Sequence, residues 1–296
     1  MVKIVIKNVE CHYNSVKALD SITFKVDEGD FIGIIGPNGS GKTTLLRCLS
    51  GILKPKVGCV LIDGEDVNLL SRREVAKRVG VVPQESYIGF NFKVLDVVLM
   101  GRHPHIRRFE NKYDLEIAFR AMEAVNVQHL ADRFITNVSG GERRRIIIAR
   151  ALAQEPEILL LDEPTVHLDI NHQIEIMELL RELCVKKRLT VIAVFHDFNL
   201  ASRYCNKLVL LSEGRILALG KPEEVLTKEN IQKAFHVEVL IEHNRLVNSI
   251  YIIPYRTITS RPKSEKIKHR GLKMMENLET PAKPSTLNRF ERANSG

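Results

Sequence analysis

Short apolar runs recur along the chain, and polar or turn-forming residues end each of them. FIGIIG (31–36) ends at a glycine, EILLLDEP (157–164) at two carboxylates and a proline, and LTVIAVFHD (189–197) at a histidine and a carboxylate. Apolar runs of this length are typical of strands buried on both faces. TTLLRCLSGI follows the first run with helical spacing and ends near Gly51. Strands of this kind separated by helices predict an α/β fold with a mostly parallel sheet.

The pattern changes between about residues 89 and 155. Helical stretches such as DLEIAFRAMEAVNVQHLADRF and GERRRIIIARALAQ follow one another there without a run that resembles a strand. We therefore expect an all-helical subdomain inserted into the sheet domain.

The C-terminal part of the chain has two further patterns. VEVLIEHNRLVNSIYIIPY (237–255) predicts two strands around a turn at residues 243–245. From residue 256 onward, Lys, Arg, Ser, Pro and Asn replace most apolar residues, which is typical of a flexible tail. The expected organisation is a sheet domain over residues 1–240, a short β extension over 237–255 and a basic tail over 256–296.

Composition and charge narrow the class of protein. The chain has 44% hydrophobic and 27% charged residues, and no apolar run reaches the roughly 18 residues that a membrane-spanning helix needs. MVKIVIKNVE at the N-terminus alternates like a strand and lacks the apolar core of a signal peptide. The five cysteines are scattered without a CxxC pair, which favours buried, reduced thiols over disulfides or a zinc site. We expect a cytoplasmic protein.

Much of the net charge of +8 lies in the tail, where ten Lys and Arg face four Asp and Glu between residues 255 and 296. The rest of the chain is nearly neutral, whereas a basic body would have indicated nucleic acid. We expect no nucleic-acid partner. The tail could be drawn to anionic lipid head groups, or it could be a solvated extension without a role.

GPNGSGKT (36–43) fits the pattern GxxxxGK[ST] between a predicted strand and a predicted helix. Glycines let the backbone close around phosphates so that successive N–H groups point inward, and the helix N-terminus adds its positive end. Lys42 is expected to reach the β- and γ-phosphates of ATP, and the Thr43 hydroxyl to hold Mg²⁺. The nucleotide-binding residues predicted in this loop are Gly36, Pro37, Asn38, Gly39, Ser40, Gly41, Lys42, Thr43 and Thr44.

ILLLDEP supplies two carboxylates at the end of a buried strand. Asp162 is placed to hold the metal through water, and Glu163 to act as general base on the attacking water. Adjacent carboxylates could instead cap the following helix, but the phosphate loop upstream makes that alternative weak.

VSGGERRR (138–145) predicts a second phosphate-binding helix start. Ser139, Gly140 and Gly141, with Glu142 after them, open a helix whose first N–H groups are free to bind an anion. One phosphate loop cannot use two such caps on the same γ-phosphate. A head-to-tail homodimer, in which each subunit closes on the nucleotide of the other, is the economical solution.

The order and spacing of the phosphate loop, SGGE, LLLDEP and FHDFNLA resemble the ATPase subunit of an ATP-binding-cassette (ABC) transporter over about residues 1–240. The resemblance implies the RecA-like core of P-loop NTPases, with an N-terminal antiparallel β-subdomain and the inserted helical subdomain. It also implies ATP hydrolysis with ATP and Mg²⁺ as cofactors.

The resemblance assigns roles to three further residues. Tyr13 matches the aromatic residue that stacks on adenine, although it could be an ordinary strand aromatic. Gln84 matches the glutamine that senses Mg²⁺ and the attacking water, although it could be a plain loop amide. His196 matches the switch histidine that contacts the γ-phosphate and holds Glu163 in place.

TVHLD resembles the family's inter-subunit loop through Leu168 and Asp169. Val166 stands where many relatives have a small polar residue. This departure puts one hydrogen bond across the dimer in doubt, but not hydrolysis.

MGRHPHIRRF (100–109) lies where, in this family, the ATPase meets a short cytoplasmic helix of a polytopic membrane permease. Arg and Phe side chains are good interface anchors, and Pro104 would stiffen the segment. His103 and His105 supply too few ligands for a strong metal-site prediction, and a solvated loop stays open.

The string MGRxPH…F is also similar to the importer subgroup that takes up iron–siderophore complexes, haem or cobalamin. The resemblance thus implies a peripheral ATPase on the cytoplasmic face of the membrane, which meets an extracytoplasmic substrate-binding protein only indirectly. The alternative is a soluble ABC ATPase that is not coupled to transport, such as a scaffold for cluster assembly.

Overall fold

The computed structural model describes residues 2–13, 16–84, 88–106 and 109–258. The strands are β1 (Val2–Tyr13), β2 (Val16–Asp27), β3 (Phe31–Ile35), β4 (Val57–Ile62), β5 (Glu65–Asp66), β6 (Val79–Val82), β7 (Ile158–Asp162), β8 (Thr190–Val194), β9 (Lys207–Ser212), β10 (Arg215–Gly220), β11 (Val237–Asn244) and β12 (Ser249–Thr257). The helices are α1 (Lys42–Leu49), α2 (Arg72–Arg78), α3 (Val94–Leu99), α4 (Lys112–Ala124), α5 (Gly140–Leu152), α6 (Ile170–Lys187), α7 (Phe198–Tyr204), α8 (Pro222–Val225) and α9 (Lys228–Phe235), with 3₁₀ turns η1 (Met100–Arg102), η2 (Gln128–Leu130) and η3 (Ile135–Asn137). Most of the predicted tail, residues 259–296, lies outside the described part.

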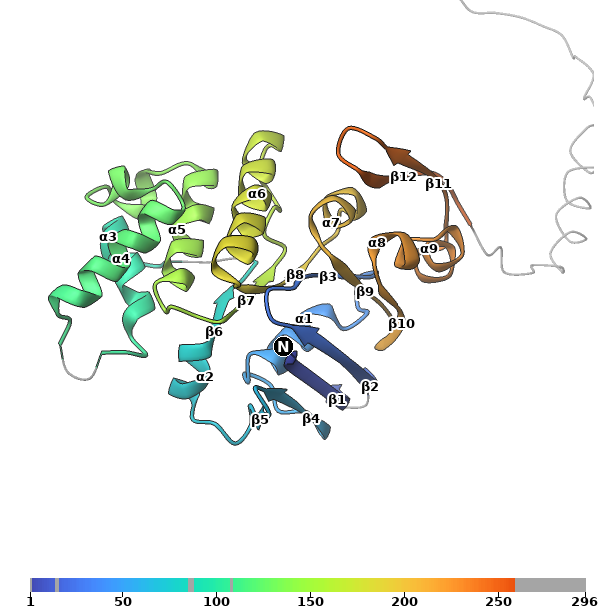
Figure 1. Ribbon diagram of the computed structural model, residues 1–296, viewed down its shortest axis with the longest axis horizontal. Coiled ribbons are helices and arrows are strands. Elements are labelled where there is room, and N and C mark those ends of the chain that lie inside the picture. The colour runs from blue at the N-terminus through green and yellow to red at the C-terminus, as the bar shows by residue number, and fades with distance from the viewer. Residues whose placement is uncertain (1, 14–15, 85–87, 107–108, 259–296) are drawn as a thin grey trace, which may run out of the picture. The chain divides into compact units, whose positions relative to one another are not determined.

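The core is a six-stranded sheet in the order β10-β9-β3-β8-β7-β6 (Figure 1). Its strands from β9 to β6 are parallel, and only β10 runs antiparallel to its neighbour. A second, antiparallel sheet has the order β2-β1-β4-β5. The three apolar runs of the sequence are β3, β7 and β8, so the prediction of a mostly parallel α/β core with an antiparallel N-terminal part is confirmed.

Alternate residues of each central strand enter two separate hydrophobic clusters. In β3, Phe31 and Ile35 pack with residues of α3 to α7. Ile32 and Ile34 of the same strand pack with α1 and the antiparallel sheet. Because both faces of the sheet are covered, its strands are apolar throughout and show no alternation of polar residues.

The helical region is formed by α3, α4 and α5, which pack on one another (Figure 1). Within the described residues of this region, the only β-type pairing is an isolated bridge between Lys93 and Phe134. The predicted helical insertion is therefore confirmed. Among the described helices, none combines the length and hydropathy needed to cross a bilayer.

The predicted C-terminal strands form the β11–β12 hairpin, but the turn lies two residues later than expected. Asn244 still pairs with Ser249, and its side chain accepts a hydrogen bond of 3.0 Å from the Leu246 N–H. This local side-chain bond caps the strand end and shifts the turn to residues 245–248. The hairpin is tied to α7, because the Ser202 hydroxyl donates to the Ile250 carbonyl at 3.0 Å.

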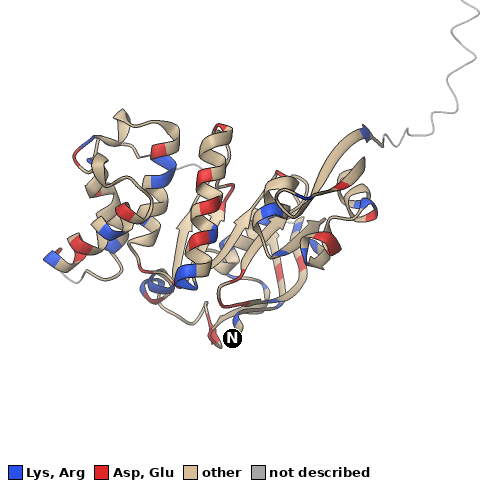
Figure 2. Cartoon of the chain, turned by 45° about the horizontal axis from the view of Figure 1, so that its top comes forward, with Lys and Arg blue, Asp and Glu red and all other residues tan. Residues whose placement is uncertain are grey.

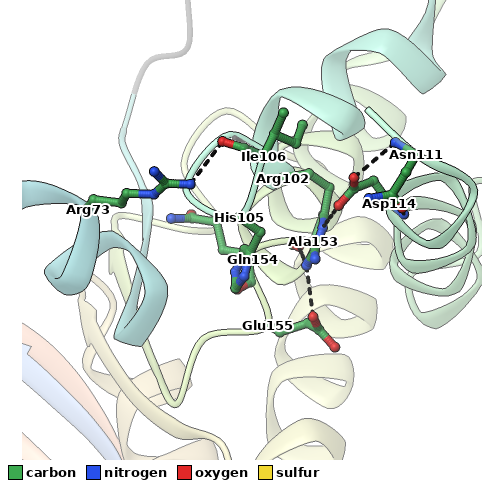
Figure 3. A network of polar contacts seen from close by, with 9 residues as sticks. All are labelled: Arg73, Arg102, His105, Ile106, Asn111, Asp114, Ala153, Gln154 and Glu155. Atoms are coloured by element: carbon green, nitrogen blue, oxygen red, sulfur yellow. Dashed lines mark hydrogen bonds and ion pairs between the residues drawn. The ribbon is translucent and has the colours of Figure 1, made fainter. Parts of the chain in front are cut away.

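A buried arginine of η1 joins the first turn of α4 to the residues that follow α5 (Figure 3). Arg102 and Asp114 are each only 2% exposed, and the Arg102 Nε donates to Asp114 Oδ1 at 3.1 Å. Arg102 also donates to Glu155 Oε2 and to the Ala153 carbonyl, both at 2.8 Å. The interpretation of the arginines of segment 100–109 as interface anchors is therefore wrong for Arg102, whose guanidinium serves the interior.

Asp114→Ala should lower the free energy of unfolding by about 3–5 kcal/mol, because it leaves the buried Arg102 cation without its carboxylate. It also removes the cap in which Asp114 accepts from the Asn111 N–H. Urea denaturation followed by circular dichroism would measure the change. Glu116→Ala, at an exposed position of the same helix, should change stability by less than about 0.5 kcal/mol. Equal losses in the two variants would contradict a stabilising role for the pair.

Candidate active site

Four neighbouring parallel strands bring the predicted site residues to one edge of the sheet. The phosphate loop follows β3, Gln84 follows β6, Asp162 and Glu163 lie at the end of β7, and His196 follows β8. The strands are adjacent in the order β3-β8-β7-β6, so their carboxyl ends meet. Crevices at such carboxyl ends are where open α/β sheets bind ligands.

The phosphate loop closes tightly against the antiparallel sheet. Gly41 precedes α1 with φ of +102°, and a Cβ at this position would lie 2.6 Å from the carbonyl oxygen of Ala18 in β2. Only glycine fits both the backbone angle and the space. The start of α1 is thereby held at the loop with its N–H groups available for an anion.

Lys42 is folded back into the phosphate loop. Its Nζ donates to the carbonyl oxygens of Gly36 and Pro37, both at 2.9 Å, and the residue is only 7% exposed. Burial lowers the pKa of Lys42 from its ordinary value. The Ser40 hydroxyl is buried in the same loop without a hydrogen-bond partner among the described residues. Both groups are suited to receive phosphate oxygens.

Asp162 and Thr43 form the oxygen-rich part of the site. The Thr43 hydroxyl donates to Asp162 Oδ2 at 3.1 Å, while Asp162 Oδ1 is buried with no partner in the described part of the chain. Burial is the main cause that raises the pKa of Asp162, against the opposing Thr43 hydrogen bond. Hydroxyl and carboxylate oxygens are the ligands that Mg²⁺ prefers, so this pair fits the predicted metal.

Glu163 is held from two sides. Gln84 Nε2 donates to Glu163 Oε2 at 2.7 Å, and His196 Nε2 lies 2.5 Å from Glu163 Oε1. The Glu163 backbone has φ of +48°, a conformation that costs a non-glycine residue about 1–3 kcal/mol and occurs often at functional sites. The structure therefore brings together three residues that lie far apart in the sequence and orients one carboxylate between an amide and an imidazole.

The remaining predicted nucleotide contacts lie at two other places. Tyr13 is 42% exposed at the end of β1. Ser139 caps α5, with its hydroxyl accepting from the Glu142 N–H at 3.3 Å while Glu142 Oε2 accepts from the Ser139 N–H at 2.7 Å. Ser139 and Gly140 are exposed, so in a single chain this helix start faces solvent.

His172 packs on this helix start, a contact that no sequence pattern predicted. A Cβ on Gly141 would lie 2.3 Å from the His172 ring. The ring is oriented by Asp169, whose Oδ1 lies 2.7 Å from His172 Nδ1 and also accepts from the His172 N–H. The start of α5 and the start of α6 are thus in contact.

Segment 100–106 borders a groove of about 840 Å³ between α2, α5 and the loop after α1. Gly101 allows the close approach, because a Cβ there would lie 2.0 Å from the Arg150 carbonyl oxygen. Arg73 of α2 clamps the segment by donating to the carbonyls of Pro104 at 2.7 Å and Ile106 at 2.9 Å. His105 Nε2 lies 2.8 Å from the Gln154 carbonyl oxygen (Figure 3).

The histidines of this segment do not converge on a metal ligand set. His105 is engaged with the backbone, and His103 is exposed at the groove. Within the described residues, no group of three or more His, Cys, Asp or Glu is placed to hold a metal ion. Residues 107 and 108 of the predicted interface lie outside the described part.

Sequence reasoning also missed Arg144, which is buried behind Glu163 and Gln84. A signal was available, because Gly141, Arg144, Ile148 and Ala151 recur at the spacing of one helix face and all four are buried. An arginine on an otherwise apolar helix face indicates a buried guanidinium that donates hydrogen bonds to interior polar groups.

Comparison with known proteins agrees with this geometry. A family model described as ABC transporter matches residues 19–166. A cobalamin import ATP-binding protein of Halobacterium salinarum is 42% identical over 244 residues, which span 82% of this chain but only 61% of that relative, less than two thirds of its length. A ferric enterobactin transport ATP-binding protein of Escherichia coli is 41% identical over 244 residues, 82% of this chain and 90% of the relative.

Two solved structures extend the likeness. An inward-facing ABC transporter assigned to the metal-chelate type has a TM-score of 0.76 and 32% identity, and the match covers 86% of this chain and 98% of that chain. A dimeric ATP-binding cassette in a post-hydrolysis state, bound to ADP and Pi, has a TM-score of 0.66 and 30% identity over 74% of this chain and 98% of that chain. The chain therefore belongs to the family of ABC transporter ATP-binding proteins.

Proposed function

We propose that this chain is the ATP-hydrolysing subunit of an ABC importer for metal chelates, such as cobalamin, ferric siderophores or hemin. The observation that carries the enzymatic part is the Glu163 carboxylate, held by Gln84 and His196 beside the Thr43–Asp162 pair and the phosphate loop. The cargo class is supported by the cobalamin and ferric enterobactin relatives and by the metal-chelate type transporter.

ATP binding is assigned to the phosphate loop and its neighbours. The loop N–H groups and the N-terminus of α1 cradle the phosphates, and Lys42 exchanges its two carbonyl partners for phosphate oxygens. The buried Ser40 hydroxyl finds a partner in the same step. Tyr13 stacks on the adenine, for which its exposed ring is available.

Thr43, Asp162 and Gln84 are assigned to Mg²⁺. Asp162 Oδ1, buried without a partner, and the Thr43 hydroxyl supply oxygen ligands, directly or through water. The metal, when bound, neutralises charge on the β- and γ-phosphates.

Hydrolysis is assigned to Glu163 with Gln84 and His196. The Glu163 carboxylate accepts a proton from a water molecule while the oxygen of that water attacks the γ-phosphorus. The bond between the γ-phosphorus and the bridging oxygen breaks, and the electron pair of that bond leaves with ADP. Gln84 and His196 keep the carboxylate in the orientation that this transfer requires. Two hydrogen bonds on one side chain limit its rotation and so reduce the entropy lost in the transition state.

The active form is proposed to be a head-to-tail homodimer. Ser139, Gly140 and Gly141 present an exposed helix start that suits a phosphate of the partner's nucleotide. The dimeric cassette bound to ADP and Pi supports this arrangement.

The permease is proposed to dock in the groove beside segment 100–106, which places the chain on the cytoplasmic face of the membrane. Ile52 and Met100 offer apolar surface, being 71% and 42% exposed. Three cations line the groove without forming an ion pair to a described residue, namely Lys54, Arg72 and Arg150. Among its described lining residues, none is acidic.

Elsewhere in the described chain, acidic and basic residues are interspersed over helices and strands (Figure 2). The groove differs from this mixed pattern, because its described charged lining residues are all basic. It suits a short permease helix that carries both apolar and acidic side chains.

Glu163→Gln should lower the ATP hydrolysis rate by about 10²–10⁴-fold, because the proton acceptor is lost while nucleotide contacts remain. With MgATP, this variant should accumulate as a dimer, measured by size-exclusion chromatography with light scattering. Glu223→Gln, at an exposed glutamate of α8, is the matched control and should hydrolyse ATP at the unchanged rate. Hydrolysis of ATP at the unchanged rate by the Glu163→Gln variant would contradict the proposed role of this carboxylate.

Asp162→Asn should raise the free energy of unfolding of the nucleotide-free protein by about 0.5–2 kcal/mol, because it removes a buried, incompletely paired charge. The variant should gain no further stability from Mg²⁺ added to ATP. Urea denaturation with and without MgATP measures both effects, and Asp132→Asn, at an exposed carboxylate, is the control. Undiminished stabilisation by Mg²⁺ would contradict the metal assignment.

Lys54→Glu combined with Arg72→Glu should reduce recovery of the chain with its co-expressed permease by about tenfold or more, because the reversed charges oppose an acidic docking helix. ATP hydrolysis by the isolated chain should not change. Lys228→Glu, a reversal at an exposed position of α9, serves as control. Co-purification in detergent reports the result, and normal recovery of the double variant would exclude docking through these cations.

A further inference from the structure

Arg144 makes an unusual set of contacts for a buried arginine. It is 9% exposed, and within the described part of the chain its guanidinium donates only to backbone carbonyl oxygens. Nε donates to Pro164 at 3.0 Å, and Nη2 donates to Asp162 at 3.1 Å and Glu163 at 3.0 Å. Nη1 donates to Pro83 at 2.7 Å and Gln84 at 3.2 Å. An arginine has five N–H donors, so every one of them is used.

These five bonds join two loops of the candidate active site. One group of carbonyls belongs to the chain around Glu163, and the other to the chain that ends at Gln84. The side chains of Glu163 and Gln84 are themselves hydrogen-bonded at 2.7 Å. Arg144 therefore binds the backbone of the same two residues whose side chains contact each other. It also holds the strained backbone of Glu163 in place.

Arg144 belongs to α5, whose first residues form the exposed helix start. Ser139 caps that start, and Arg144 lies in the second turn, so the two are parts of one rigid helix. When the helix start moves, the Arg144 guanidinium must therefore move with it. Because the guanidinium is bonded to both loops, the movement acts on them as well.

We propose that Arg144 is a positioning residue that couples the two ATP sites of the dimer. Closure of the Ser139 helix start on the nucleotide of the partner moves α5, and Arg144 transmits that movement to Glu163 and Gln84 of its own subunit. The proposal rests on the proposed head-to-tail dimer. Coupling requires two sites, two positions of the helix and contacts that join them, and the five Arg144 bonds supply those contacts.

Arg144 could instead serve only the stability of the fold. Burial lowers its pKa to about 10, so it is still a cation near pH 7 and its bonds to carbonyls are strong. A purely structural residue would affect stability and nucleotide binding together. A coupling residue affects the turnover rate and the cooperativity between sites while ATP binding and dimer formation persist.

The test is Arg144→Lys in the full chain. Lysine keeps the charge, but its donors share one nitrogen and cannot bond both loops in the arginine geometry. We expect kcat to fall about 10–100-fold with KM changed less than about twofold. The Hill coefficient for ATP should fall from near two to near one. In a Glu163→Gln background, the variant should still dimerise with MgATP.

Arg145→Lys is the matched control, because Arg145 neighbours Arg144 on the same helix but pairs with Glu175. It should leave kcat and the Hill coefficient unchanged. The proposal is overturned by wild-type kcat and cooperativity in Arg144→Lys, by a wild-type Hill coefficient near one, or by joint loss of folding and ATP binding in both Arg144→Lys and Arg144→Gln. Failure of Glu163→Gln alone to dimerise with MgATP would instead refute the proposed dimer, independently of Arg144.

Discussion

The parallel pairing of β3, β8, β7 and β6 is the constraint on which the active site depends. Parallel strands present their carboxyl ends at one edge, so four loops from distant parts of the sequence have to meet there. The phosphate loop lies at one end of this row and Gln84 at the other, with Glu163 and His196 between them. The pairing itself is stabilised by apolar residues on both faces of the sheet.

The polar groups of the site are buried at a cost that the rest of the fold offsets. Lys42 is bonded to loop carbonyls, Asp162 Oδ1 and the Ser40 hydroxyl lack a partner in the described chain, and Glu163 adopts a positive φ. Each feature is unfavourable in the nucleotide-free protein. Each group can also bind a phosphate, a metal ion or an attacking water. Locally unfavourable features of this kind are common at functional sites.

Three arginines have different roles according to what surrounds them. Arg102 is enclosed with Asp114 and Glu155, and Arg144 with five carbonyl oxygens. Arg150, by contrast, lines the open groove. Hydrogen bonds to carboxylate or carbonyl oxygens are what permit a guanidinium to be buried. Arg102 and Arg144 therefore connect segments of the interior, whereas the half-buried Arg150 borders the groove.

The partnership of Glu163 with His196 was expected only from the family resemblance. The strands β3, β7 and β8, the helical region and the phosphate loop could be predicted from the sequence alone. These follow from short-range patterns, because strand burial, helix spacing and glycine placement are properties of neighbouring residues. Only the tertiary structure decided that Arg102 and Arg144 are interior and that His172 packs on Gly141. Their partners come from distant segments, 61 residues away in the Arg144–Pro83 bond. Burial of a charged side chain is set by such long-range neighbours, which the local pattern does not contain.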